Sequence, residues 1–202
     1  MAERIGVFGG SFNPIHIGHL VIAEAARQEF KLEKVLFIPT GDTPNKTMHH
    51  IDKYARCRMV ELAVEDNPFF AVSHMELERK GPSYTVDTIR ILQEQMKNAE
   101  FYFIAGTDAV ADLPAWRYNK ELLEACHFIC ASRPGNEDKL RETVRYFGDL
   151  GLSRIHFLRT PELEISSTIL RGFIRADRSV RYLMPDAVIR YIHDHQLYKG
   201  TW

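Results

Sequence analysis

The chain has 202 residues, of which 45% are hydrophobic and 26% are charged, a composition typical of an ordered globular protein with a substantial core. Its formal net charge of -1 provides no overall basic field to hold nucleic acid, so we expect no nucleic-acid partner. The chain has an odd set of three cysteines, and its first segment reads as a strand rather than a leader. We therefore expect free thiols and a cytoplasmic protein. Apolar runs far shorter than about 20 residues argue against a membrane partner.

Apolar runs alternate with helical patterns along most of the chain. Runs rich in β-branched and aromatic residues predict buried strands at residues 4–9, 34–39, 69–77, 100–106, 127–132 and 154–158. Apolar residues at helical spacing predict helices at 20–30, near 52–66 and from Ser83 onward. We therefore expect an α/β fold with a Rossmann-like, doubly wound parallel sheet of about six strands, in which ligands bind beyond the carboxyl ends of the strands.

The end of the chain carries two further helical patterns, at 167–176 and 186–195, separated by a turn around Pro185. We expect a single domain over residues 1–202, made of an α/β core at 1–160 and a small C-terminal helical part at 161–202. The HDH run at 193–195 is interpreted as the end of an amphipathic helix, because a metal-dependent phosphohydrolase would draw its ligands from several separated segments.

The first loop, GGSFNPIHIGHL at residues 9–20, follows the first strand and leads into a helix. His16 and His19 are three residues apart, so both imidazoles can face one ligand and donate hydrogen bonds to phosphate oxygens. Gly18 lets the backbone approach a phosphate, and the helix N-terminus adds unpaired amides. A metal pair and two structural histidines are the alternatives. The dinucleotide fingerprint GxGxxG and the P-loop GxxxxGK[ST] are both absent from the sequence.

Two segments together resemble a known superfamily. GSFNPIHIGHL resembles the (H/T)xGH signature of nucleotidyltransferases related to class I aminoacyl-tRNA synthetases, and EISSTILR at 164–171 resembles their second signature. We expect Ser166 to cap a helix and leave the amides of Ser167 and Thr168 free, with Arg171 on the same face. Together these groups would clamp an anion. The alternative is a capped helix with a solvated arginine.

Three later segments are similar to bacterial nicotinate-nucleotide adenylyltransferases: RKGPSYTVDT at 79–88, GTDAVADLPAW at 106–116 and SRPG at 132–135. The likeness runs in order from residue 5 to about residue 198. It implies transfer of AMP from ATP to nicotinate mononucleotide, giving nicotinate adenine dinucleotide and pyrophosphate in NAD biosynthesis. ATP and nicotinate mononucleotide would be the partners, and Mg²⁺ would be bound mainly through the ATP phosphates, with no dedicated metal ligands on the protein.

The resemblance also implies the place of the nicotinate ring. With Ser83 as N-cap, the amides of Tyr84 and Thr85 would point outward and bind the carboxylate, while Trp116 would stack on the ring. The alternatives are a plain capped helix and a core tryptophan.

For ATP, the resemblance implies that Gly106 leaves room for the adenosine and that Asp108 accepts hydrogen bonds from the ribose, the alternative being an N-cap aspartate. Arg133 would pack on the adenine or reach a phosphate, unless it is a surface arginine. Catalysis is assigned to His16, His19 and Arg171. The residues assigned to ATP and its phosphates are Gly9, Gly10, Ser11, Gly18, Lys46, Gly106, Asp108, Arg133, Ile165, Ser167 and Thr168.

The sequence departs from the family pattern at a few positions. Asn13 stands where an aspartate is common, and Thr107 where a second glycine is common. In IPTGDTPNK at 38–46, Thr43 and Asn45 replace a proline and a histidine of a PPHK segment, although Lys46 is kept. These departures put individual contacts in doubt and leave the reaction class intact.

Other functions remain open at this point. The acceptor could be nicotinamide mononucleotide or phosphopantetheine, and a non-catalytic nucleotide sensor could use the same phosphate groups; a homo-oligomer is also open.

Cys126 and Cys130 are expected to be buried thiols on one face of a strand. Arg56 and Arg58 are expected to be solvated, on a helix whose Met59, Leu62 and Ala63 face the core.

Overall fold

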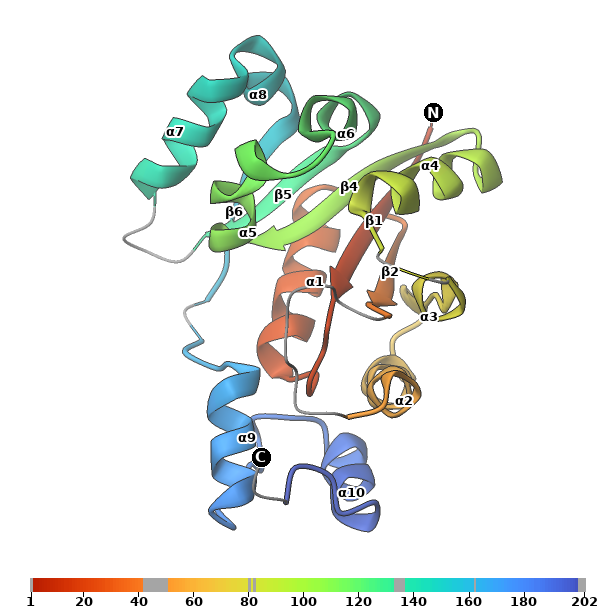
Figure 1. The fold of residues 1–202 in the computed structure, drawn as a ribbon, viewed down its shortest axis with the longest axis vertical. Coiled ribbons are helices and arrows are strands. Elements are labelled where there is room, and N and C mark those ends of the chain that lie inside the picture. The colour runs from red at the N-terminus through yellow and green to blue at the C-terminus, as the bar shows by residue number, and fades with distance from the viewer. Residues whose placement is uncertain are drawn as a thin grey trace. The chain divides into compact units, whose positions relative to one another are not determined.

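The fold is seen in a computed structural model that describes residues 2–41, 51–79, 81, 83–132, 137–161 and 163–199 (Figure 1). Its strands are β1 (Glu3–Gly10), β2 (Lys34–Pro39), β3 (Phe70–Val72), β4 (Ala99–Gly106), β5 (His127–Ser132) and β6 (Ile155–Arg159). Its helices are α1 (Ile17–Glu29), α2 (Lys53–Val64), α3 (Met75–Glu78), α4 (Thr85–Gln95), α5 (Thr107–Ala111), α6 (Asn119–Ala125), α7 (Glu137–Phe147), α8 (Asp149–Arg154), α9 (Ser167–Arg175) and α10 (Asp186–Asp194), with a 3₁₀ turn at Leu113–Ala115.

The strands form one six-stranded sheet in the order β3-β2-β1-β4-β5-β6. β1 pairs with β4, β4 with β5 and β5 with β6, and all three ladders are parallel. The order reverses between β1 and β4, which is the switch point where doubly wound sheets bind ligands. The expected Rossmann-like α/β fold is therefore confirmed.

Strand β4 shows why the sheet needs helices on both faces. Residues 101–105 are buried without a break, whereas a strand with one solvated face would alternate between buried and exposed positions. Cys126 and Cys130 are buried free thiols, as expected, but only Cys130 lies in the neighbouring strand β5, because Cys126 is the C-cap of α6. Burial raises the pKa of the Cys130 thiol to about 12, so it stays protonated and behaves as a small apolar side chain.

Contacts divide the chain into two compact units. One, called here the sheet unit, comprises Met1–Gly9, Ile22–Leu36 and Tyr84–Glu162, and the other, called the loop unit, comprises Gly10–Val21, Phe37–Ser83 and Leu163–Trp202. The sheet unit holds β4, β5 and β6 with α4 to α8. The loop unit holds the first loop, α2, β3, α3, α9 and α10, and α10 packs on α2 within it. The C-terminal helices thus share a unit with the first loop.

One predicted strand differs from the structure. The expected strand at 69–77 ends at Val72, and Met75–Glu78 form one turn of helix in which the Glu78 amide donates to the His74 carbonyl oxygen at 3.2 Å. The adjacent residues Glu76 and Leu77 are both buried, which the alternation of a half-exposed strand does not allow. The structure also adds the helices α5 to α8. Three of them have only five to seven residues, too few for a clear periodic signal, whereas α7 has 11 residues and an amphipathic pattern that the expected helices did not include.

No helix in the described part of the chain is long and apolar enough to cross a membrane.

Candidate active site

Two stacked imidazoles form the centre of the first loop, within the loop unit. The rings of His16 and His19 lie with centroids 3.7 Å apart and planes tilted by 31°. The His16 amide donates a hydrogen bond to His19 Nδ1 at 3.2 Å. Because Nδ1 accepts, the proton of a neutral His19 ring lies on Nε2.

Burial keeps this histidine neutral. The pKa of His19 lies well below its ordinary value, first because burial disfavours the charged ring and second because His16 is adjacent. Phe12 contributes to the apolar surroundings, with its ring edge-on to His19 at 5.2 Å between centroids. A neutral ring whose Nδ1 accepts has its one N–H at Nε2, and such a donor can stabilise charge on a phosphate oxygen.

Gly18 lies against the ring of His16. A Cβ atom built on Gly18 would lie 3.0 Å from His16 Nδ1 and 3.1 Å from its Cε1, and 3.9 Å from Cβ of Ile165. The contacts with the imidazole are tighter than side chains normally make. The structure thus supplies a reason for glycine here that the sequence did not suggest: it makes room for the imidazole, besides any approach to a phosphate.

The second signature packs against the first loop. Arg171 donates from Nη1 to the Asn13 carbonyl oxygen at 2.8 Å and from Nη2 to Thr168 Oγ1 at 3.1 Å, and Ser167 Oγ donates to the Pro14 carbonyl oxygen at 2.9 Å. Ser166 caps α9 as predicted, accepting from the Ile169 amide at 3.3 Å. The alternative of a solvated arginine is wrong, since Arg171 is partly buried and burial lowers its pKa.

Tyr198 makes a third hydrogen bond to the same loop, and the sequence alone did not indicate this role. Its hydroxyl donates to Asn13 Oδ1 at 2.6 Å, and its ring is buried. Burial raises the pKa of Tyr198, so the phenol keeps the proton that it donates. Asn13, which stands where an aspartate is common in the family, therefore has a hydrogen-bond partner near the end of the described chain.

Arg56 is buried, which contradicts the expectation of a solvated side chain: it is only 6% exposed. Its Nη1 donates to the Ser11 carbonyl oxygen at 2.6 Å, and its Nη2 donates to the carbonyl oxygens of Thr40 and Gly41 at 2.7 and 3.3 Å. Arg58 is exposed, as expected. Arg56 thus joins the first loop to the segment that follows β2, a role that the sequence did not indicate.

The sheet unit holds the residues assigned to adenosine. Gly106 ends β4, is exposed, and leaves open space around a built Cβ. Asp108 is exposed in the first turn of α5, whose N-cap is Gly106, so the alternative of an N-cap aspartate is wrong. The hydroxyl of Thr107, the second departure, donates to the Ala131 carbonyl oxygen at 3.2 Å and ties α5 to β5.

The residues assigned to nicotinate lie at the start of α4 and after the 3₁₀ turn. The N-cap of α4 is Tyr84, with no side-chain cap, so the expected capping by Ser83 is wrong. The first amides of the helix, including that of Thr85, have no acceptor within it. Trp116 is partly exposed and packs edge-on against Phe103 and Phe128, each at 6.4 Å between centroids.

The remaining assigned residues are divided between the two units and the undescribed segments. Gly9 lies in the sheet unit, where a built Cβ would meet the Phe103 ring at 3.4 Å, whereas Gly10 and Ser11 begin the loop unit. Lys46 and Arg133, with the departures Thr43 and Asn45, lie outside the described residues.

Chemically, the loop unit gathers donors suited to an anion. The neutral imidazole of His19, the guanidinium of Arg171 and the amides at the start of α9 all offer hydrogens to oxygen. The two signatures lie 158 residues apart where Arg171 meets Asn13, so the pairing is a product of the fold. This arrangement fits a phosphate group that gains or redistributes charge.

Comparisons with known proteins agree with this chemistry. The sequence pattern of the cytidylyltransferase-like family matches residues 7–173. A protein of Desulfitobacterium hafniense (strain Y51), named "Probable nicotinate-nucleotide adenylyltransferase", is 46% identical over 200 residues, which cover 98% of this chain and 96% of that relative. A protein of the same name from Thermoanaerobacter sp. (strain X514) is 43% identical and covers 97% and 94%.

A solved structure shares the fold. The Plasmodium falciparum nicotinic acid mononucleotide adenylyltransferase, complexed with NaAD, superposes with a TM-score of 0.79 at 20% identity, covering 98% of each chain. The same enzyme complexed with APC gives 0.77 at 19% identity and the same coverage.

Proposed function

The chain belongs to the cytidylyltransferase-like family, and from this membership and its near full-length relatives we propose that it is a nicotinate-nucleotide adenylyltransferase. It transfers AMP from ATP to nicotinate mononucleotide in NAD biosynthesis. The structural observation that carries this function is the contact of Arg171 with the first loop, since it brings both phosphate signatures of the superfamily into one place.

The reaction needs no protein nucleophile. A 5′-phosphate oxygen of nicotinate mononucleotide attacks the α-phosphorus of ATP, a P–O bond forms there, and the bond to the β-phosphate breaks to release pyrophosphate. Catalysis of this kind depends on positioning and on stabilising charge. Donors held in advance by the fold supply both.

The hydrogen-bond donors gathered at the first loop and the start of α9 each have a role in this scheme. His19 donates from Nε2 to an oxygen of the transferring or leaving phosphates, with His16 stacked beside it. Arg171 and Thr168 hold the triphosphate, together with the amides at the start of α9. The Ser167 hydroxyl already donates to Pro14, so its backbone amide is the group that it offers to a phosphate.

Mg²⁺ belongs to the substrate in this scheme. The site residues of the loop unit offer imidazole, guanidinium, hydroxyl and amide donors, whereas Mg²⁺ prefers oxygen ligands in a strict octahedron. The ion would therefore travel with ATP, held by phosphate oxygens and water, and neutralise part of the triphosphate charge.

The sheet unit supplies the specificity for the two nucleotides. Open space around Gly106 and the exposed carboxylate of Asp108 suit a nucleoside with ribose hydroxyls. The uncapped amides at the start of α4 and the partly exposed indole of Trp116 suit a flat ring that carries a carboxylate. This pairing favours nicotinate over the neutral amide of nicotinamide.

The experiment measures pyrophosphate release from ATP in the presence of Mg²⁺. Nicotinate mononucleotide, nicotinamide mononucleotide and phosphopantetheine are compared side by side as acceptors. We expect the highest kcat/KM with nicotinate mononucleotide. A preference for either of the other acceptors would replace the proposed substrate and keep the reaction class. Tight ATP binding without release for any acceptor would leave a nucleotide sensor instead.

We also propose that the chain works in the cytoplasm. Its cysteines, Cys57, Cys126 and Cys130, are free and buried, and unpaired thiols are typical of proteins kept in reducing surroundings.

A further inference from the structure

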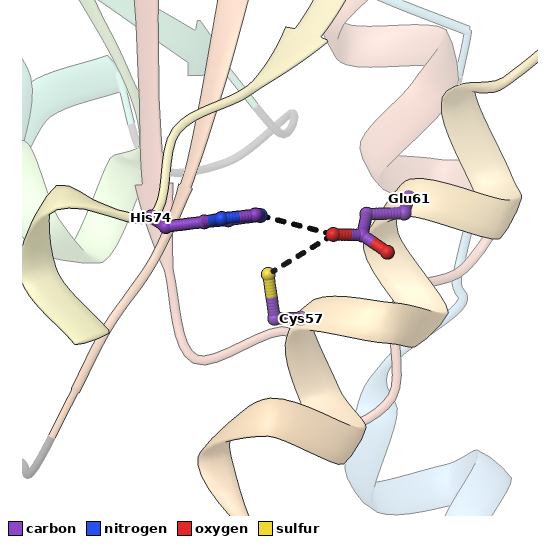
Figure 2. Close-up of side chains that lie close together, drawn as sticks. All are labelled: Cys57, Glu61 and His74. Atoms are coloured by element: carbon purple, nitrogen blue, oxygen red, sulfur yellow. Dashed lines mark hydrogen bonds and ion pairs between the residues drawn. The ribbon is translucent and has the colours of Figure 1, made fainter. Parts of the chain in front are cut away.

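Three side chains with different metal-binding atoms meet in the loop unit, outside the candidate active site. Figure 2 shows Cys57, Glu61 and His74 converging, with Glu61 Oε1 between the other two. His74 Nε2 lies 2.9 Å from Glu61 Oε1, and Cys57 Sγ lies 4.0 Å from it. All three ligand atoms lie within 4.8 Å of one another.

The fold gathers them from two elements. Cys57 and Glu61 are four residues apart on α2, so they share one face of the helix. His74 is the N-cap residue of α3, directly after β3, and α2 packs on β3. A ligand bound by all three would fasten α2 to the turn that starts α3.

Burial places the softest ligand on the inside and opens the site to solvent on the other side. Cys57 is 3% exposed, whereas the side chains of Glu61 and His74 are 31% and 50% exposed. An ion can therefore enter from solvent and meet a shielded sulfur. Thiolate, imidazole and carboxylate are together the ligand set of zinc, and a sulfur ligand selects against Mg²⁺ and Ca²⁺.

Arg58 prepares the carboxylate for this role. Its Nη1 donates to Glu61 Oε2 at 2.9 Å, which orients the group and leaves Oε1 toward Cys57 and His74. The hydrogen bond from Arg58, and a weaker one from His74, hold the pKa of Glu61 below its ordinary value, so it is ionised. Outer partners of this kind commonly orient metal ligands.

The spacing requires side-chain movements of up to about 1 Å. Bonds of about 2.0–2.3 Å at tetrahedral angles separate the ligand atoms of a zinc site by roughly 3.5 Å. The 2.9 Å pair would open and the 4.0 Å pair would close by about half an ångström each. The third pair, Cys57 Sγ and His74 Nε2, lies within 4.8 Å and would close the most, for which the half-exposed His74 has room to turn.

We propose that Cys57, Glu61 and His74 bind one Zn²⁺ ion, with water as the fourth ligand. Burial and the adjacent Glu61 raise the pKa of the Cys57 thiol to about 11, so the free protein carries the proton there. Binding exchanges that S–H proton for the S–Zn bond and releases H⁺ to solvent. The ion is a structural clip, and its binding does not depend on the adenylyl transfer.

The test uses the full chain stripped of metal with a chelator, in the absence of ATP. Zn²⁺ is titrated in competition with a chromophoric chelator, and Co²⁺ serves as an optical probe for a tetrahedral site with thiolate. We expect one equivalent of each ion, a thiolate-to-Co²⁺ absorption band that Cys57→Ser removes, and at least about tenfold weaker Zn²⁺ binding in His74→Gln.

The matched control is His193→Gln, which removes another exposed histidine paired with a carboxylate, Asp194 at 3.3 Å. It should leave the affinity unchanged. The exposed position of His74 keeps the test independent of folding, and Mg²⁺ at millimolar concentration should not compete. Absence of Zn²⁺ binding, binding that survives in both ligand variants, or equal loss in His193→Gln would each overturn the site. None of these outcomes bears on the adenylyl transfer, which pyrophosphate release measures separately.

Discussion

The two stacked imidazoles of the first loop are held by different neighbours. His19 is anchored at Nδ1 by the His16 amide, which sets its tautomer. The ring of His16 lies against the Cα of Gly18, where a larger residue would displace it. Both constraints act before any ligand binds, so the donors are oriented in advance and cost little reorganisation during the reaction.

Replacing His19 with alanine removes the Nε2 donor. We expect kcat for pyrophosphate release to fall by about a hundredfold or more, the range for losing one preorganised donor. His193→Ala, at the exposed end of α10, is the control and should keep full turnover. Near-normal turnover in His19→Ala would remove this histidine from the mechanism.

Replacing Gly18 with alanine tests the packing of the imidazoles. The new Cβ would lie 3.0 Å from His16 Nδ1, so the ring must give by a few tenths of an ångström. A misplacement of about 1 Å can cost about a hundredfold in rate, so we expect this smaller shift to lower kcat by roughly threefold to tenfold. Gly172→Ala, in α9 next to Arg171, meets nothing within 4 Å and should keep its activity while gaining up to about 1 kcal/mol in stability. Equal activities of the two variants would contradict the role of Gly18.

Between elements, Arg56 connects segments that the chain order keeps apart. From the buried face of α2 it reaches Ser11 after β1 and Thr40 and Gly41 after β2. A Cβ atom built on Gly41 would clash with the Glu76 carbonyl oxygen, so this crossing also needs a glycine. One side chain thus bonds the first loop and the segment after β2 to a single helix.

Arg56→Met should destabilise the protein, because it leaves buried carbonyl oxygens without a donor. We expect a loss of about 2–4 kcal/mol in the free energy of unfolding, measured by urea denaturation in the presence of a chelator. Arg58→Met is the matched control from the same helix. Its pair with Glu61 is exposed, so its loss should cost about 0–1 kcal/mol. Comparable losses in both variants would refute the distinction.

For the whole molecule, stability should depend on a histidine network in the sheet unit. His127 Nδ1 lies 2.8 Å from His156 Nε2, and Arg154 Nη1 lies 2.8 Å from His127 Nε2, with Glu100 Oε1 at 3.2 Å. Burial first, and the positive charge of Arg154 second, lower the pKa of both histidines. Both are therefore neutral in the folded protein at neutral pH.

These pKa values are lower in the folded protein than the ordinary 6.5 of the unfolded chain. Below pH 6.5 the unfolded chain binds more protons, so the free energy of unfolding should fall as the pH drops from 6.5 toward the folded values. The slope begins as the unfolded histidines start to bind protons, so these groups should contribute none above about pH 7.5. Urea denaturation between pH 5 and 8 measures this, and His127→Gln combined with His156→Gln should flatten the slope except for the share of His19, whose pKa shifts in the same direction. An unchanged slope in the double variant would contradict the assignment.

Much of the fold could be predicted because its signals are local. The strands at 34–39 and 127–132 match β2 and β5 residue for residue, and the others, except 69–77, lie within one residue of the observed ends. Short helices such as α5 and α8 carry too few residues for a periodic signal. Ser83 failed as a cap, since Tyr84 holds that position without a side-chain bond.

The sequence by itself determined the positions of every strand except β3, the two phosphate signatures and the Ser166 cap, because each depends on residues within a few positions of one another. Only the tertiary structure decided that Arg171 reaches Asn13 across 158 residues, that Arg56 is buried against a loop 45 residues away, and that His74 meets Cys57 and Glu61. A side chain shows its type in the sequence, but its partners depend on how distant elements pack. Arg56 and Arg58 look alike in the sequence, and the packing of α2 alone separates them.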